Sequence, residues 1–313
     1  MNWMTVAFAG YFFSAIASVV DKSLLSEKRI GAPALYAFFV SLMNLPFLAI
    51  IPFGFVRFTP SAVAIGIVAG VLYLFGLLMM YYAIKQSEVS RAAPLVGASA
   101  IAFLFLFSVT SALVAGKHIS FLHVFAIALL AGGATLLSAG KRGVHDSRFV
   151  LSVLVAGAFQ AGSLILLRQS YLASNFITGL IWSKFGIFLA GLSLFLVPSF
   201  RESILSGHGR FSKPEHKTAG TAGFFAFNQV FGGLGALLVS YAVSLGPATF
   251  VQGMGGVQFG LVFVFAMLLS ARYPATFEER VSRRETIRKT VAIALLSLGI
   301  WLVALGGDLA GFL

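Results

Sequence analysis

The sequence predicts an all-α integral membrane protein with ten transmembrane helices, arranged as two inverted five-helix repeats around a central cavity. Three observations lead to this fold class: the composition, the number of long apolar stretches, and similar segments in the two halves. Of the 313 residues, 59% are hydrophobic and 10% are charged, and the mean hydropathy is +0.96. A soluble domain has a quite different balance, so the chain is predicted to lie in lipid.

Continuous apolar stretches recur along the chain, and each has roughly the 20 residues that a helix needs to cross a bilayer. A membrane barrel would instead show alternating segments of about ten residues, and the sequence has none. Because lipid offers the backbone no hydrogen-bond partners, such stretches are expected to be helical. We predict helices near residues 4–20, 33–53, 61–84, 91–114, 121–140, 148–171, 176–198, 218–244, 248–270 and 288–307.

The first stretch follows a start without Lys or Arg, so we interpret it as a permanent helix and not as a signal peptide. Positive charge is uneven among the connections, with Arg57 and Lys117 as the clear cations of the poor set. The positive-inside rule therefore predicts a multi-pass protein of the cell's inner (plasma) membrane with both termini non-cytoplasmic. The basic connections, which follow the first, third, fifth, seventh and ninth helices, include Lys28, Arg29, Lys141, Arg142, Arg201, Arg210, Lys213, Arg280, Arg283 and Arg284.

Several classes of function are disfavoured by composition. The formal charge of +12 is dispersed over short connections, so nucleic acid is not an expected partner. The absence of cysteine excludes disulfides and thiolate chemistry, and the five histidines lack metal-ligand spacing. We therefore expect no cofactor, no metal site and no catalytic residues.

Similar segments occur in the same order in the two halves of the chain. AIALL occurs at 126–130 and again at 292–296, and Tyr82-Ala83-Ile84 matches Tyr241-Ala242-Val243, with a glycine six residues before each tyrosine. These matches predict a first repeat at 1–140, a linker at 141–147 and a second repeat at 148–313. An odd-numbered unit duplicated in tandem enters the membrane in opposite orientations, an arrangement that supports alternating access to a site near the midplane.

On these features the chain resembles the EamA-type, ten-helix members of the drug/metabolite transporter superfamily. The resemblance rests on the five-plus-five layout, the two Tyr-Ala-Ile/Val helix ends, the short turn before Ala93-Pro94-Leu95, and the glycine-rich fifth and tenth helices. It implies a cavity walled mainly by helices 1–4 and 6–9, and export of amino acids or other metabolites. It also implies cytoplasmic termini, which is the opposite of the orientation predicted from loop charge.

One lysine stands out as a candidate ligand for substrate. Lys184 lies about nine residues into the predicted seventh helix, where a lysine costs roughly 2.5–3.5 kcal/mol to insert. It is expected to face a wet cavity or a partner, where its ammonium group could hold a carboxylate or phosphate. The alternative is a structural role, either in a contact to a helix-terminal carbonyl or as a cavity-facing structural charge.

Neutral polar side chains supply further candidates, because amides both donate and accept hydrogen bonds. Each could equally form a bond between helices. Asp21 and Arg168 lie at the ends of the first helix of each half, where we expect anchoring or a place at a gate. The candidate substrate-binding residues are Lys184, Tyr82, Asn44, Asn228, Gln229, Gln252 and Gln258.

The leading hypothesis is a transporter of small polar metabolites, amino acids first, with the lipid bilayer and a small-molecule substrate as partners. No Asp or Glu lies near the centre of a predicted helix, which disfavours proton coupling through a buried acid and favours exchange, or coupling through Lys184. A flippase for a lipid-linked headgroup is the alternative, and a membrane-embedded enzyme is a weaker one. The GxxxG spacings at 66–70 and 256–260 are too common in membrane helices to predict a dimer, so we expect a monomer.

Overall fold

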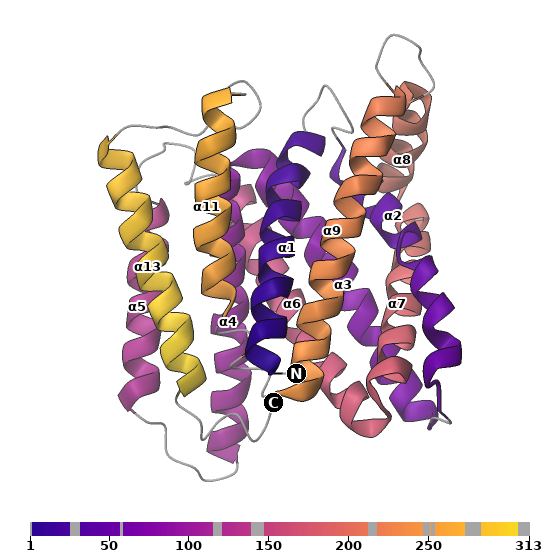
Figure 1. The fold of residues 1–313 in the computed structure, drawn as a ribbon, viewed down its shortest axis with the longest axis horizontal. Coiled ribbons are helices and arrows are strands. Elements are labelled where there is room, and N and C mark those ends of the chain that lie inside the picture. Colours follow the sequence, from indigo (N-terminus) through magenta and orange to yellow (C-terminus); the bar gives the residue numbers. More distant parts are fainter. Residues whose placement is uncertain are drawn as a thin grey trace.

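The computed structural model describes residues 2–25, 32–56, 59–114, 121–138, 147–211, 218–246, 251, 254–272 and 283–305, and within these ranges every regular element is helical (Figure 1). The prediction of an all-helical protein is confirmed for this part of the chain. In chain order the elements are α1 (Trp3–Leu24), α2 (Pro33–Leu42), η1 (Leu45–Phe53), α3 (Pro60–Gln86), α4 (Val89–Val114), α5 (Phe121–Ser138), α6 (Ser147–Ala173), α7 (Phe176–Ser193), η3 (Leu194–Leu196), α8 (Pro198–Phe211), α9 (Thr218–Leu245), α11 (Gly255–Arg272) and α13 (Arg283–Leu305).

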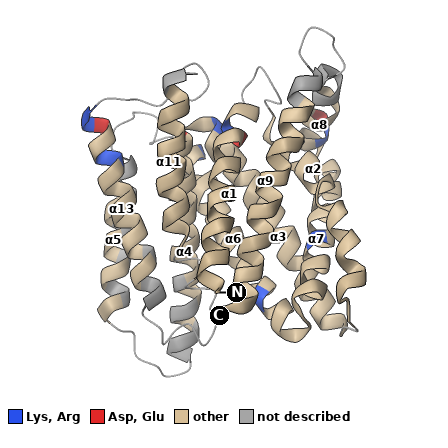
Figure 2. Ribbon diagram, in the orientation of Figure 1, with Lys and Arg blue, Asp and Glu red and all other residues tan. Residues whose placement is uncertain are grey.

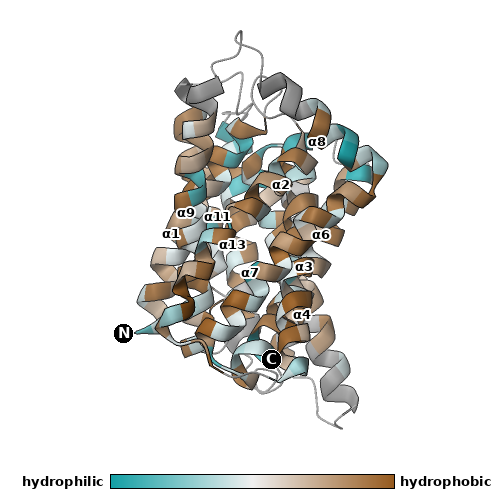
Figure 3. Cartoon of the chain, turned by 90° about the vertical axis from the view of Figure 1, so that its right-hand side faces the viewer, coloured by the Kyte–Doolittle hydropathy of each residue, from teal (hydrophilic) through white to brown (hydrophobic). Residues whose placement is uncertain are grey.

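Six of the described helical segments are long and apolar enough to cross a membrane, as expected of a membrane protein. Hydrophobic residues make up most of the long helices, whereas hydrophilic residues gather on α8 (Figure 3). Large apolar side chains such as Leu172 and Leu196 are exposed, where lipid can cover them. The six segments are Trp3–Leu24, Pro33–Phe53, Pro60–Gln86, Ser147–Ala173, Phe176–Leu196 and Ala222–Leu245.

The segment predicted as one helix at 33–53 consists of two helices with different geometry. The α-helical part ends at Leu42, and a 3₁₀ helix continues from Leu45. Pro46 has no backbone N–H to bond Leu42 O, the carbonyl four residues before it, so the α-helical pattern cannot continue. Just before it, the Asn44 backbone N–H bonds Ser41 O at 3.3 Å in the 3₁₀ pattern, and the Asn44 side-chain Nδ2 donates to Val40 O at 2.8 Å.

Charged residues gather at one end of the bundle, which we call the basic end (Figure 2). It holds the last turn of α1, with Lys22, and the first turn of α13, with Arg283 and Arg284. α1 begins and α13 ends at the opposite end (Figure 1). The basic end also carries α8, a helix of 14 residues in a stretch that the sequence analysis assigned to a connection.

Close backbone approach is a feature of the contact between α3 and α7. A Cβ atom added to Gly70 would lie 1.9 Å from Ser183 O, and one added to Gly186 would lie 2.2 Å from Ile67 O. Only glycine allows the two backbones to come this near. The GxxxG glycine Gly70 therefore serves packing within the chain.

A buried ion pair joins the last long helix to the first half of the chain. Lys289 Nζ of α13 lies 2.7 Å from Glu88 Oε2, and each side chain is 2% exposed. Lys289 Nζ also donates to Ser90 Oγ at 3.2 Å. The sequence analysis had no indication of this contact, because the two residues are 201 positions apart in the chain.

Candidate functional site

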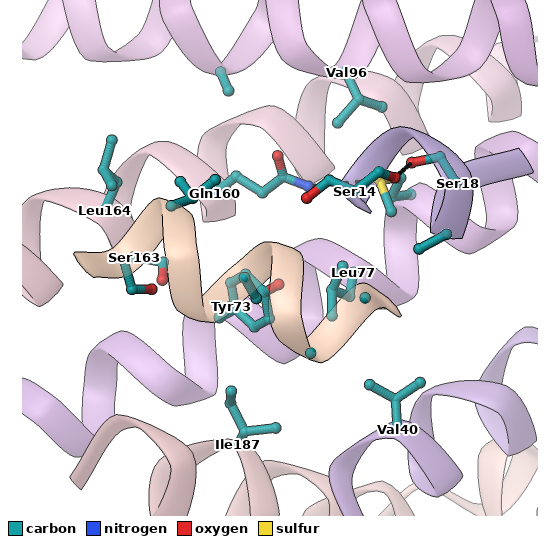
Figure 4. A pocket seen from close by; sticks show the side chains of 18 of the residues that line it. Ser14, Ser18, Val40, Tyr73, Leu77, Val96, Gln160, Ser163, Leu164 and Ile187 are labelled. Atoms are coloured by element: carbon teal, nitrogen blue, oxygen red, sulfur yellow. Dashed lines mark hydrogen bonds between the residues drawn. The ribbon is translucent and has the colours of Figure 1, made fainter. Parts of the chain in front are cut away.

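A cavity of about 320 Å³ lies between the helices of the two halves. Its walls come from α1, α2, η1, α3, α4, α6, α7, α9 and α11, and no described residue of α5 or α13 lines it. Figure 4 shows Tyr73 of α3, Gln160 of α6 and Ser14 of α1 on its walls, with Ser18 Oγ donating to Ser14 O at 2.9 Å. The volume lies at the lower end of the range for small-molecule sites.

Lys184 lines this cavity and is 6% exposed. Its Nζ lies 4.6 Å from the ring centroid of Phe47, a cation–π contact. Among the described residues, no side-chain or backbone oxygen accepts a hydrogen bond from Nζ. In the described part of the structure, Lys184 therefore makes no hydrogen bond to a helix-terminal carbonyl.

The break between α2 and η1 places two residues at the cavity. Asn44 lies at the break and Phe47 follows it in η1, and both line the wall beside α7. The Asn44 Nδ2 bond to Val40 O gives this side chain a structural role, while the same residue borders the cavity. A substrate contact of Asn44 remains a prediction.

Amides from the second half also line the cavity. Gln258 Nε2 of α11 donates to Ser18 Oγ at 3.3 Å, which connects α11 to α1. Asn228 and Gln229 of α9 both line the cavity, although Asn228 is engaged in bonds to two side chains described below. Gln160, which was not chosen as a candidate, lines the wall from α6 and donates to Met80 Sδ at 3.8 Å.

Two candidates do not have a described place at the cavity. Tyr82 is absent from its lining, whereas the adjacent Tyr81 and, two turns earlier, Tyr73 are present. Successive helical residues point about 100° apart, so a difference of one position moves the ring to another face of α3. Gln252 lies outside the described residues.

The sequence analysis missed the role of Asp21 because the residue lies near a helix end. The structure shows Asp21 7% exposed and on the cavity wall. Tyr36 of α2 donates to Asp21 Oδ1 through its hydroxyl, and Asn228 Nδ2 of α9 donates to the same oxygen at 2.6 Å. No acid near the centre of a helix is involved, but Asp21 in the last turn of α1 is a buried acid on the cavity wall, which the sequence analysis did not foresee.

Two cations occupy similar places near the C-terminal ends of α1 and α6. Lys22 Nζ, in the last turn of α1, donates to Ile84 O at 2.8 Å and to Ser87 O at 2.6 Å. Arg168 Nη1, near the end of α6, donates to Val243 O at 3.4 Å and to Gly246 O at 3.3 Å. Each cation thus binds the last carbonyls of another helix, where positive charge is stabilising.

Comparison with known proteins gives the fold alone. No protein-family model and no curated protein matches the chain. A solved structure described only as "Crystal structure of protein" is similar over 96% of this chain and 98% of that chain, with a TM-score of 0.56 and 18% identity. At that identity the likeness concerns the fold of nearly the whole chain.

Proposed function

We propose that the protein is a membrane transporter of small polar metabolites that carry an anionic group, with amino acids as the first candidates. It works by alternating access between two inverted five-helix halves, as expected from its resemblance to EamA-type transporters. The observation that supports the proposal is the Lys184 ammonium group on the cavity wall, which contacts the Phe47 ring and forms no ion pair with an acid among the described residues.

The choice of an anionic group follows from the electrostatics of that lysine. A charge taken out of water is costly unless it is paired, and the described side chains around Nζ leave this charge uncompensated. A carboxylate or phosphate entering the cavity would supply the missing charge and a charge-assisted hydrogen bond. The amides of Gln160, Gln229 and Gln258 add neutral donors and acceptors to the same wall.

Recurring helix contacts support the inverted repeat and the ten crossings. In the proposed repeat, α1 corresponds to α6, α3 to α9 and α4 to α11. In this correspondence, the contact between α1 and α9 is equivalent to the contact between α6 and α3. The contact between α1 and α11 is likewise equivalent to the contact between α6 and α4. The helices that end the two halves, α5 and α13, pack against each other.

Individual contacts follow the same correspondence. Lys22 binds the carbonyls of Ile84 and Ser87, and Arg168 binds those of Val243 and Gly246. Both carbonyl pairs are three residues apart and begin at the last residue of the matching Tyr-Ala-Ile and Tyr-Ala-Val segments. We also propose the orientation that loop charge predicts, in which the basic end is cytoplasmic.

The test is uptake of radiolabelled amino acids and organic acids by proteoliposomes that contain the purified protein. Lys184→Met should weaken binding of an accepted substrate by about 10- to 150-fold, because a hydrogen bond to a charged group contributes roughly 1.5–3 kcal/mol. Lys85→Met, which removes an exposed lysine at the end of α3, is the matched control and should leave flux unchanged.

Two results would count against the proposal. Absence of protein-dependent flux over the whole panel would refute transport of these metabolites. Flux of an anionic substrate that is equally fast in Lys184→Met and in Lys85→Met would refute the assignment of Lys184.

A further inference from the structure

Asp21, Tyr36 and Asn228 form a cluster, the Asp21 cluster, that joins three helices. Asp21 belongs to α1, Tyr36 to α2 and Asn228 to α9, and each is less than 9% exposed. The carboxylate Oδ1 accepts from both partners, and Asn228 Nδ2 also lies 3.0 Å from the Tyr36 hydroxyl. The positions of these residues, 21, 36 and 228, show that tertiary packing assembles the cluster.

The Asp21 cluster is part of the contact between α2 and α9. Aromatic rings continue it: Tyr36 and Phe39 of α2 lie 5.3 and 5.8 Å from Phe225 of α9, measured between ring centroids. No glycine-lined backbone approach like that of α3 and α7 joins these two helices in the described residues. Near Asp21, the described contacts between α2 and α9 are therefore made by side chains and not by a close approach of the two backbones.

No cation pairs with Asp21 among the described residues. Its neighbour Lys22 donates instead to carbonyls at the end of α3. The titratable groups that face Asp21 from neighbouring helices are Tyr36 of α2 and Tyr73 and Tyr81 of α3. Helices α9 and α11 contribute the neutral amides Asn228 and Gln258. The charged groups where α3 meets α4 are Lys85, Glu88 and Arg91, of which Glu88 is paired with Lys289.

The two protonation states of Asp21 bind α2 and α9 with different strength. A carboxylate accepts charge-assisted hydrogen bonds, which are roughly twice as strong as bonds between neutral groups. Protonation of Asp21 weakens both bonds to Oδ1 at once, because the neutral acid no longer accepts charge-assisted hydrogen bonds. The cavity wall gives the carboxyl group a route to water and protons.

We propose that Asp21 is a proton-binding site that couples proton binding to separation of α2 from α9 at the basic end. The deprotonated carboxylate holds the two helices together, and the protonated acid releases them. The inference goes beyond the proposed transport function, because it names a proton as the coupling ion and gives its site. It rests on the proposed transport function only in that the proton is called a coupling ion; the proton-dependent separation of the two helices does not require transport.

The experiment measures the distance between α2 and α9 as a function of pH and needs no substrate. Because the native chain has no cysteine, Ala32→Cys at the start of α2 and Ala222→Cys in α9 give a specific spin-label pair. Double electron–electron resonance measures the distance between the two labels in lipid nanodiscs from pH 5 to 9. The population with the longer distance should increase as the pH falls. For one proton, the ratio of the two populations changes tenfold per pH unit near the midpoint.

Variants of the cluster separate the proposal from general effects of pH. Asp21→Asn should give a distance distribution that does not change with pH and resembles that of the wild type at low pH. Glu202→Gln, which neutralises an exposed acid on α8, is the control and should keep the wild-type response. Tyr36→Phe keeps the acid but removes one donor, so the longer distance should appear at a higher pH than in the wild type.

A wild-type distance that is constant from pH 5 to 9, or a response that survives in Asp21→Asn, overturns the proposal. If Asp21→Asn does not fold, an unchanged midpoint in Tyr36→Phe overturns it equally. A negative flux screen with an intact pH response in the wild type would refute the transported substrates and leave the proton site standing.

Discussion

Replacing Lys289 by methionine should destabilise the protein far more than replacing Lys289 and Glu88 together. The 2.7 Å separation of the two charges corresponds to an attraction of about 6 kcal/mol at an effective dielectric constant near 20. Removal of two ions from water costs several kcal/mol for each, so the intact pair contributes little net stability. Loss of one partner removes the countercharge of this pair from an ion that stays buried, and breaking a buried pair in this way costs about 3–5 kcal/mol.

The assay is a double-mutant cycle of Lys289→Met, Glu88→Met and the double variant. Unfolding by SDS in mixed micelles, followed by tryptophan fluorescence, gives the free energy of unfolding of each protein. Each single variant should lose about 3–5 kcal/mol, and the double variant should recover most of that loss because the pair can be replaced by apolar side chains. Single-variant losses below about 1 kcal/mol, as for exposed pairs, or a double variant that equals the sum of the singles, would refute the reasoning.

Two other features of packing give further predictions. Gly70→Ala should lower the midpoint of thermal unfolding, because its Cβ would lie 1.9 Å from Ser183 O and overpacking costs about 1–3 kcal/mol. Gly223→Ala on α9, where an added Cβ meets nothing within 4 Å, should be neutral or stabilising, and equal losses in both would contradict the close contact. Lys22→Met should cost more stability than Arg168→Met, because its bonds of 2.6 and 2.8 Å are shorter than the 3.3 and 3.4 Å bonds of Arg168. The midpoint of thermal unfolding of the two variants tests this ranking, and a larger decrease in Arg168→Met than in Lys22→Met would contradict it.

The helical character of the chain could be predicted because it depends on a local property, the length of apolar stretches. Details that depend on one residue or on amphipathic surfaces were harder to foresee. Pro46 is visible in the sequence, but whether a proline only kinks a membrane helix or changes its geometry depends on the partner for the freed carbonyl. Here the freed carbonyl is that of Leu42, and the turn before it changes to the 3₁₀ pattern, with Asn44 N–H bonded to Ser41 O and Asn44 Nδ2 to Val40 O.

The difference between Tyr82 and Tyr81 has a similar cause. α3 is apolar around its whole circumference, so its sequence contains no polar stripe that would fix which face looks into the cavity. The residues that line the cavity are selected by the helices around α3, in particular α6 and α7. The cavity position of Lys184 could be predicted because a charged side chain deep in the membrane needs a wet cavity or a partner, whereas a tyrosine is tolerated on any face of the helix.

Asp21 shows where position along a helix is a poor guide to environment. A carboxylate near a helix end is normally expected to reach water, but α2 and α9 cover this one with Tyr36 and Asn228. By its carbonyl contacts Arg168 corresponds to Lys22 in the proposed repeat, so the position that corresponds to Asp21 is the apolar Leu167. Only the first half then carries an acid at this position. A proton-dependent contact would therefore act at the basic end alone, which gives two otherwise similar halves a direction.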